Sequence, residues 1–323
     1  LNEVTAKSAE DDHRHWEWYF VKSLCRQGEF LDGYLIQAPP DCPLRLLARV
    51  EGETATFVDL DSGKVALTVT GGAGGCRLNR DGSLLAMSNN DHVEVYDLAA
   101  RKLLWKKGFD VQLFEWSPDG TQLFAYRPGD VFDTWDARSG AKLLEFDRAD
   151  TARYSHGCAW SSDSQSVAVV FTSGKIGVWD AVSGKLQYVL KVPDADAFYD
   201  VSVWTVAWNP SGDRIVAGGR NLLYVFDSET RKIERTIRAH RGPISVVAWS
   251  PDGRLIASTG LADSIVKIWD ADTGEKVNAF RGHTSMIYSV VWLKDGLSLA
   301  SKSQEHGPIV WNRGERAQPF PLP

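Results

Sequence analysis

One pattern of apolar and polar positions recurs along the chain. Two apolar stretches of strand length, separated by a polar turn, are followed by a third stretch that ends in an aromatic or apolar residue and then Asp or Asn. The second positions of these closing dipeptides lie 38, 39, 44, 47, 43 and 42 residues apart. A period of this size predicts a repeat protein built from one supersecondary unit. The seven dipeptides are Val58-Asp59, Tyr96-Asp97, Trp135-Asp136, Trp179-Asp180, Phe226-Asp227, Trp269-Asp270 and Trp311-Asn312.

Turn residues recur with the same period. The turn between the first two stretches reads LNRDGS from Leu78, WSPDGT from Trp116, WSSDSQ from Trp160, WNPSGD from Trp208, WSPDGR from Trp249 and WLKDGL from Trp292. Pro presets φ and Asp-Gly tolerates positive φ, so each turn predicts a tight hairpin. A second polar turn follows the dipeptides, as in DLDSGK from Asp59. Two successive hairpins predict a four-stranded unit.

These repeats resemble those of the WD-repeat family, and the resemblance extends from Gly28 to the C-terminus. It implies an all-β fold: a seven-bladed β-propeller of four-stranded antiparallel blades. A single blade cannot bury both of its faces, whereas a closed ring packs each blade between two others. Closure also hides most sheet edges.

The sixth unit matches best the hydrogen-bonded tetrad of this family. The resemblance implies a buried structural chain of bonds, and each member needs a partner once water is removed. Ser, His and Asp together also suggest a nucleophilic triad, but we favour the structural role. The seventh unit has Glu305 and the fourth has Ser173 where the tetrad has Asp. The predicted tetrad is His240, Ser258, Asp263 and Trp269.

The N-terminal region lacks the turn rhythm. Within residues 11–25, Trp16, Phe20 and Leu24 are four apart and predict a short amphipathic helix. We therefore expect a helical lead-in over 1–27 and a propeller over 28–323. A Trp-Glu-Trp helix before a propeller resembles the repeat regions attached to some bacterial serine/threonine kinases, which implies a kinase-associated, bacterial context. The chain begins with Leu1 and shows no signal-peptide layout, so we expect it to be part of a larger multidomain chain.

Ring closure needs a fourth strand for the last blade. The C-terminal PFPLP is rich in Pro, which cannot donate to a sheet ladder. The segment from Gly28 to Leu31 is the better candidate for that strand.

Charge and composition narrow the range of partners. Lys and Arg total 36 against 42 Asp and Glu, a net charge of −6 that disfavours nucleic acid. No stretch approaches the roughly 20 apolar residues of a membrane helix, so no membrane insertion is predicted. The four cysteines have no metal-ligand spacing. We expect a cytoplasmic protein without cofactor or metal.

Motifs for catalysis are weak. The glycine-rich segment at 71–75 has no following Lys-Ser/Thr, and the chain has no G-x-S-x-G. The sequence therefore predicts no enzyme and no catalytic residues. The alternative is a propeller hydrolase, or a binder of a carbohydrate or nucleotide, that uses the central channel.

The starts of the inner strands are the candidate binding surface. In this family they point to the face where peptides dock, and Tyr, Trp and Met are favoured at interface cores. Such aromatic residues can also simply cover strand ends. The sequence predicts a non-enzymatic scaffold that binds a protein or peptide on this face. The predicted contact residues are Tyr154, His156, Ser202, Trp204, Ser245, Met286 and Tyr288.

Overall fold

The computed structural model describes residues 46–51, 54–59, 65–70, 75–88, 92–109, 113–127, 131–147, 154–171, 173–193, 203–293, 296–303 and 309–312. The predicted N-terminal helix, the candidate strand at 28–31 and most of the glycine-rich segment lie outside these residues. The boundary predicted at residue 27 lies outside them as well.

The described residues are all-β, with 26 strands and no helix. The strands form seven antiparallel sheets, and in each sheet every strand pairs with its neighbours in sequence. The first sheet and the last have three described strands and the other five have four.

The first three sheets take up the chain to residue 145. Sheet one holds β1 (Leu46–Glu51), β2 (Thr54–Asp59) and β3 (Val65–Thr70). Sheet two holds β4 (Gly75–Leu78), β5 (Leu84–Ser88), β6 (Val93–Asp97) and β7 (Lys102–Lys107). Sheet three holds β8 (Leu113–Trp116), β9 (Gln122–Arg127), β10 (Val131–Asp136) and β11 (Lys142–Glu145).

The remaining four sheets follow in order. Sheet four holds β12 (Tyr154–Trp160), β13 (Ser166–Phe171), β14 (Lys175–Asp180) and β15 (Leu186–Lys191). Sheet five holds β16 (Thr205–Trp208), β17 (Arg214–Gly218), β18 (Leu222–Asp227) and β19 (Ile233–Arg238). Sheet six holds β20 (Ile244–Trp249), β21 (Leu255–Gly260), β22 (Ile265–Asp270) and β23 (Lys276–Arg281). Sheet seven holds β24 (Ile287–Trp292), β25 (Ser298–Ser303) and β26 (Ile309–Asn312).

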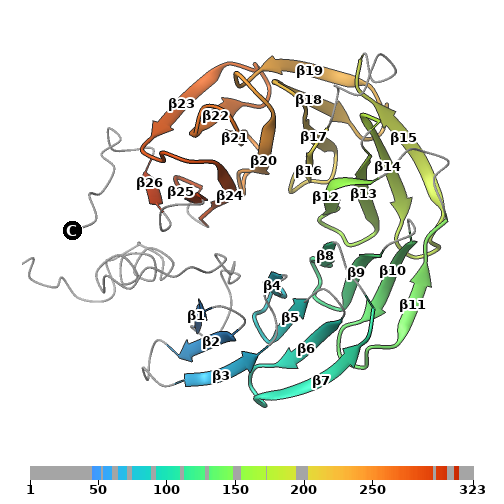
Figure 1. Ribbon diagram of the computed structural model, residues 1–323. Helices are drawn as coiled ribbons and strands as arrows, with labels where there is room; N and C mark the ends of the chain where they lie inside the picture. The colour runs from blue at the N-terminus through green and yellow to red at the C-terminus, as the bar shows by residue number, and fades with distance from the viewer. Residues whose placement is uncertain are drawn as a thin grey trace, which may run out of the picture.

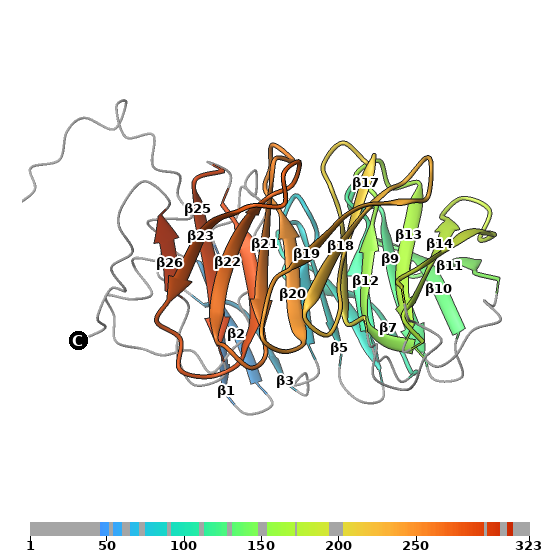
Figure 2. The same cartoon turned by 90° about the horizontal axis from the view of Figure 1, so that it is seen from above.

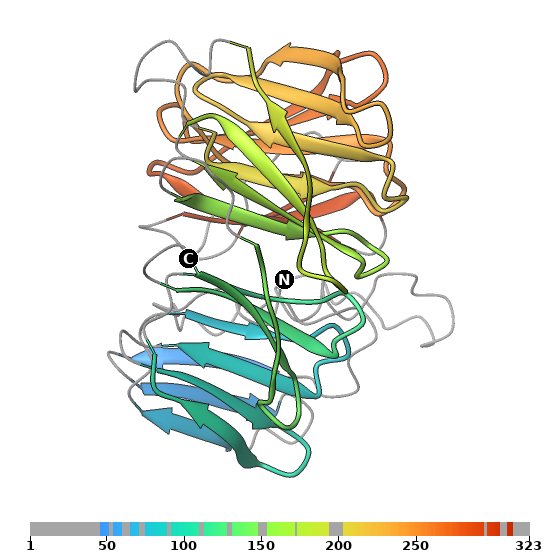
Figure 3. The ribbon, with the colours of Figure 1, turned by 90° about the vertical axis from the view of Figure 1, so that its right-hand side faces the viewer.

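The sheets are arranged radially around a common centre. In Figure 1, β8, β12, β16, β20 and β24 lie innermost, and β7, β11, β15, β19 and β23 lie on the outside. The inner strands of neighbouring sheets contact one another, as β12 contacts β16 and β20 contacts β24. Seen edge-on in Figure 3, the early and late sheets form two groups on opposite sides of the ring. The arrangement is that of a propeller.

Alternation along each strand explains why the sheets stack. On β17, Ile215 and Ala217 pack against sheet four, while Val216 between them packs against sheet six. All three side chains are fully buried. Successive side chains of a strand point to opposite faces, so one apolar strand fills two interfaces. Each fully buried Ile, Val or Phe contributes about 1.5–3 kcal/mol, which makes these interfaces the main source of stability.

Each of the seven repeat dipeptides ends a strand, and in sheets two to six its Asp accepts hydrogen bonds from the turn that follows. The Asp136 carboxylate accepts the Ser139 backbone N–H at 2.7 Å, and Asp180 accepts that of Ser183 at 2.6 Å. Hydrogen bonds from Ser139 and Ser183 lower the pKa of the two carboxyls. Because the folded-state pKa is lowered, this stabilisation is present above the ordinary pKa and is lost as the pH falls through the lowered value.

The hairpin turn between the first and second strands of a sheet contains a residue with positive φ. The Gly120 N–H donates to the Ser117 carbonyl at 2.8 Å, and the Gly253 N–H donates to the Ser250 carbonyl at 2.9 Å. Both glycines adopt φ near +70°, a region that other residues enter at a cost. In the WSSDSQ turn, which has no Gly, Ser164 adopts this conformation with φ of 61°.

Gly140 combines positive φ with contact between two sheets. It lies in the turn after β10 with φ of +66°, and a Cβ there would lie 2.6 Å from Cγ of Trp105 on β7. The Trp105 indole N–H donates to the Ala137 carbonyl at 3.0 Å, which holds the ring in place.

We expect Gly140→Ala to lower the free energy of unfolding by about 3 kcal/mol, because it adds overpacking to backbone strain. The matched control is Gly253→Ala, where φ is +71° but the Cβ would be 3.6 Å from Pro210. Only the strain remains there, so we expect a loss of about 1 kcal/mol. Urea unfolding of both variants measures the difference, and equal losses would contradict the packing argument.

Candidate functional site

The strands of every sheet run between two faces of the molecule. Because the strands are antiparallel, different connections lie at each face. The fourth strand of one sheet ends where the first strand of the next begins, and the turn between second and third strands lies at that same end. We call this end the link face and the opposite end, which carries the two hairpin turns of each sheet, the hairpin face. Figure 2 shows the strands running between the two faces.

Three of the first strands are irregular where they begin at the link face. The pairing register shifts between Ile287 and Ser289 in sheet seven and between Ile244 and Val246 in sheet six. Tyr288 and Ser245 are therefore the inserted residues. A similar shift lies between Tyr154 and Cys158 on β12. A β-bulge re-aims its side chain relative to the regular strand, so Tyr288, Ser245 and His156 among the predicted contact residues coincide with points where the backbone departs from the regular sheet.

Sheet seven exposes two predicted residues that flank Ile287. Met286 is 40% exposed and Tyr288 is 38% exposed, whereas Ile287 between them is buried. The Lys302 ammonium lies 5.8 Å from the centre of the Tyr288 ring, and Lys302 itself is only 5% exposed. A cation at this distance from an aromatic ring attracts it, which favours one orientation of Tyr288.

The other large exposed apolar residues lie toward the hairpin face. Among the described residues, no sheet has more than one of them. These six residues are Val65, Leu103, Leu143, Val182, Val277 and Leu297.

The remaining predicted contact residues differ in their surroundings. The Ser245 hydroxyl lies 2.8 Å from the Thr259 hydroxyl and donates to the Ile287 carbonyl at 2.8 Å, so it joins sheets six and seven. Trp204 is half-buried, and its backbone N–H donates to the Gly218 carbonyl at 3.0 Å. Tyr154 and His156 lie on β12, but their side chains are outside the description, and Ser202 is outside it altogether.

Four buried residues of sheet six form a chain of hydrogen bonds. The Trp269 indole N–H donates to Ser258 Oγ at 2.8 Å, and Ser258 Oγ lies 2.8 Å from His240 Nε2. His240 Nδ1 lies 2.9 Å from Asp263 Oδ2, which also pairs with Lys267. Burial lowers the pKa of His240 and outweighs the effect of Asp263.

The same chain argues against a nucleophilic role. Burial acts to raise the pKa of Asp263, but the bonds to His240 and Lys267 outweigh it, so the pKa is lowered. Ser258 is fully buried, and its oxygen already contacts two side chains. A nucleophile must reach its substrate, and the geometry here is that of a structural network.

Other sheets have partial versions of this network. In sheet seven, His283 Nε2 lies 2.8 Å from Ser301 Oγ, which accepts the Trp311 indole N–H at 2.7 Å. Glu305 lies outside the described residues. In sheet four the Trp179 indole N–H instead donates to the Asp147 carbonyl at 2.9 Å, a backbone atom of the preceding repeat.

Sequence reasoning missed a second set of tryptophans that join the sheets. The Trp249 indole N–H donates to the Ala207 carbonyl at 3.1 Å, and that of Trp292 donates to the Ala248 carbonyl at 3.2 Å. In each case the acceptor lies on the first strand of the preceding sheet. The signal in the sequence is the Trp that opens each WSPDG-like turn, which we used only to locate the turn.

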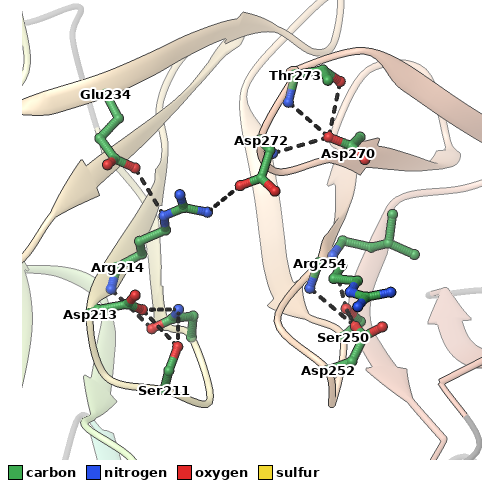
Figure 4. Close-up of polar contacts among 12 residues, drawn as sticks. Ser211, Asp213, Arg214, Glu234, Ser250, Asp252, Arg254, Asp270, Asp272 and Thr273 are labelled. Carbon is green, nitrogen blue, oxygen red and sulfur yellow. Dashed lines mark hydrogen bonds and ion pairs between the residues drawn. The ribbon is translucent and has the colours of Figure 1, made fainter.

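An ion-pair bridge also joins sheets five and six near the hairpin face. Arg214 donates from Nη1 to Asp272 Oδ1 at 2.6 Å, and its Nε lies 3.0 Å from Glu234 Oε2 (Figure 4). Asp270 accepts the backbone N–H groups of Asp272 and Thr273, which holds the turn that presents Asp272. The bridge is a property of tertiary structure, since Arg214 and Asp272 are 58 residues apart.

Within the described part of the chain, no three His, Cys, Asp or Glu residues are grouped so that they could hold a metal ion. The described residues also contain no helix long and apolar enough to cross a membrane.

Comparison with known proteins supports the repeat assignment. The model of the family "WD domain, G-beta repeat" matches residues 195–227 and 231–270, which span most of sheets five and six. A chain in the crystal structure of the mitotic checkpoint complex superposes with a TM-score of 0.70 and 19% identity, covering 88% of this chain and 92% of that one. At this identity the similarity shows the fold.

Curated relatives match over parts of the chain. The intraflagellar transport protein 80 homolog of Mus musculus is 32% identical over 143 residues, 44% of this chain and 17% of that protein. The meiotic recombination protein rec14 of Schizosaccharomyces pombe is 29% identical over 35% of this chain and 37% of its own length. The G-protein subunit beta-1 of Homarus americanus is 26% identical over 31% and 29%. The chain therefore spans well under two thirds of these relatives. All three are eukaryotic, and none supports the bacterial, kinase-associated context predicted from the N-terminal segment.

We expect Ser258→Ala to lower the free energy of unfolding by about 3 kcal/mol, because it leaves both His240 Nε2 and the Trp269 indole N–H without their partner in a buried site. The exposed Ser162 supplies the control, and Ser162→Ala should change stability by less than about 0.5 kcal/mol. Chemical unfolding at neutral pH measures both. If the two variants were equally stable, the network would not hold the sheet.

Proposed function

We propose that this chain is a non-enzymatic scaffold that binds a protein or peptide on its link face. The observation that carries the proposal is the exposure of Met286 and Tyr288, which flank Ile287 at the start of β24. The proposed face extends across the starts of the first strands of sheets four to seven. It comprises Tyr154, His156, Ser202, Trp204, Ser245, Met286 and Tyr288.

The physical properties of this face suit a protein partner. Tyr, Trp and Met are enriched at the cores of protein interfaces, where they bury large apolar areas. Tyr288 is positioned by a bulge and by Lys302 rather than by a flexible loop. A side chain that is already held loses little conformational entropy on binding, so the framework favours recognition without rearrangement.

The similarities to known proteins point in the same direction. The matched structure is a chain of a multiprotein complex, and one matched relative is a subunit by name. We extend to this chain the property that these names share, which is assembly with other proteins.

We expect Met286→Ala/Tyr288→Ala to reduce capture of partner proteins from a lysate by about tenfold, because it removes the apolar centre of the face. The matched control is Val277→Ala/Leu297→Ala, which truncates two exposed apolar residues of sheets six and seven toward the hairpin face. Quantitative mass spectrometry after affinity capture measures the retained proteins.

Two results would count against this face. Capture of the same proteins at the same level by the Met286/Tyr288 variant would show that the link face is not used. Selective loss in the Val277/Leu297 control would move the binding surface to the hairpin face. Both variants must first show wild-type thermal unfolding.

We also propose that the chain forms a closed seven-bladed ring over 28–323, preceded by a helical lead-in over 1–27. Sheet seven has three described strands, and its outermost is β26. An unpaired outer strand leaves backbone donors and acceptors without a ladder. The segment from Gly28 to Leu31 is the proposed fourth strand, which would join the two ends of the ring.

Two truncations test ring closure. Removal of residues 1–26 takes away only the lead-in, whereas removal of 1–31 also takes away the proposed strand. We expect the second truncation to lower the thermal unfolding midpoint well below the first, because it opens the ring. Equal midpoints for the two truncated proteins would contradict this role of residues 28–31.

A further inference from the structure

Three arginines meet on the link face where sheet five joins sheet six. Arg220 lies in the turn between β17 and β18, Arg238 ends β19, and Arg241 lies in the link to β20. All three side chains are exposed. We call this group the arginine junction.

Backbone hydrogen bonds hold the junction together. The Ala239 N–H donates to the Asn221 carbonyl at 2.9 Å, and the Ile244 N–H donates to the Gly219 carbonyl at 3.0 Å. The two acceptors flank Arg220 in the turn, and the two donors lie before and after Arg241 in the link. The bonds therefore hold the turn against the link. Arg238 belongs to the same end because it ends β19, whose last residue pairs with Leu222.

The link is also fixed on the side of sheet six. A Cβ at Gly242 would lie 2.8 Å from the Ala262 Cβ, so the backbone after Arg241 runs directly against the turn between β21 and β22. The Leu261 N–H donates to the Pro243 carbonyl at 2.8 Å. The arginines are thus carried by a rigid backbone.

Two of the three arginines, Arg238 and Arg241, have no acidic partner in the described part of the chain, since no carboxylate there lies within ion-pair distance of either guanidinium. The carboxylate in the neighbouring turn is Asp263, which is 8% exposed and already contacts His240 and Lys267. By contrast, Arg214 at the hairpin face of sheet five pairs with both Glu234 and Asp272.

We infer that the arginine junction binds an acidic peptide segment of a partner protein. The inference rests on the proposed function, since the junction lies on the same face as Met286 and Tyr288. A guanidinium offers planar, paired donors that match a carboxylate, and it is only weakly hydrated. Exposed guanidinium groups held close together on a rigid backbone suit a short run of Asp or Glu better than a single ion.

Charge favours a peptide over nucleic acid at this surface. Nucleic-acid sites neutralise many phosphates along an extended basic surface, whereas the junction has three arginines on a chain with a net charge of −6. A short acidic peptide needs positive charge only at the junction itself. A long polyanion would also be repelled by the net negative charge of the rest of the chain.

Fluorescence anisotropy with labelled octaglutamate tests the inference. The test variant is Arg220→Glu/Arg238→Glu/Arg241→Glu. The control is Lys185→Glu/Lys232→Glu/Lys276→Glu, which makes the same change in net charge at exposed residues near the hairpin-face ends of sheets four, five and six. We expect the wild type and the control to bind octaglutamate and the test variant to bind at least about tenfold more weakly. Added salt should weaken the binding.

Several outcomes would overturn the inference. One is equal binding by the test variant and the control, and another is no binding by the wild type. A third is tighter binding of an octathymidylate probe that the test variant loses, which would make the junction a nucleic-acid surface. If the arginine variant still captures the proteins that Met286→Ala/Tyr288→Ala loses, the inference fails while the proposed function stands. Thermal unfolding of each variant establishes that it is folded.

Discussion

The packing of each sheet between two others is the constraint on which the rest of the structure depends. A four-stranded sheet with apolar side chains on both faces is not stable alone in water. In β17 the alternation of Ile215, Val216 and Ala217 fills two interfaces from one strand. Apolar clusters likewise join the other neighbouring sheets from sheet two to sheet seven, so the stability of each of these sheets depends on its neighbours.

Polar groups then fix how the sheets meet. The Asp that ends the third strand holds the following turn in several sheets, as Asp180 does through Ser183. Trp249 and Trp292 donate across to the preceding sheet, and Arg214 bridges sheets five and six near the hairpin face. Each bond is worth about 1 kcal/mol, much less than the apolar interface it accompanies. These bonds fix the register and the spacing between neighbouring sheets, because they would break if one sheet moved along the other.

Rigidity is the property of the proposed binding surface on the link face that favours recognition. Its exposed groups sit on strand ends, bulges and turns that are tied by backbone hydrogen bonds, as at Tyr288 and around the arginine junction. Met286 and Tyr288 lie at the start of the inner strand β24. Arg220 lies in the turn between the middle strands of sheet five, and Arg238 and Arg241 lie at and after the end of its outer strand. A partner that has both an apolar anchor and an acidic segment would match the two parts of this face.

The repeat, its turns and the ends of its strands could be predicted from the sequence alone. Those features are local: Pro, Asp and Gly impose particular φ values, and each third strand ends at the dipeptide that opens a capped turn. The resemblance of the sixth repeat to the WD-repeat family also predicted the hydrogen-bonded group of His240, Ser258, Asp263 and Trp269. Tertiary structure alone decided the contacts between repeats, such as Arg214 with Asp272 and Trp292 with the Ala248 carbonyl. It also decided that the Ser245 hydroxyl joins two sheets, that Tyr288 is exposed, and that Arg220 and Arg241 share a junction. The physical reason is that a repeat specifies its own hydrogen bonds through neighbours in sequence, whereas exposure and contact between sheets depend on how the repeats stack.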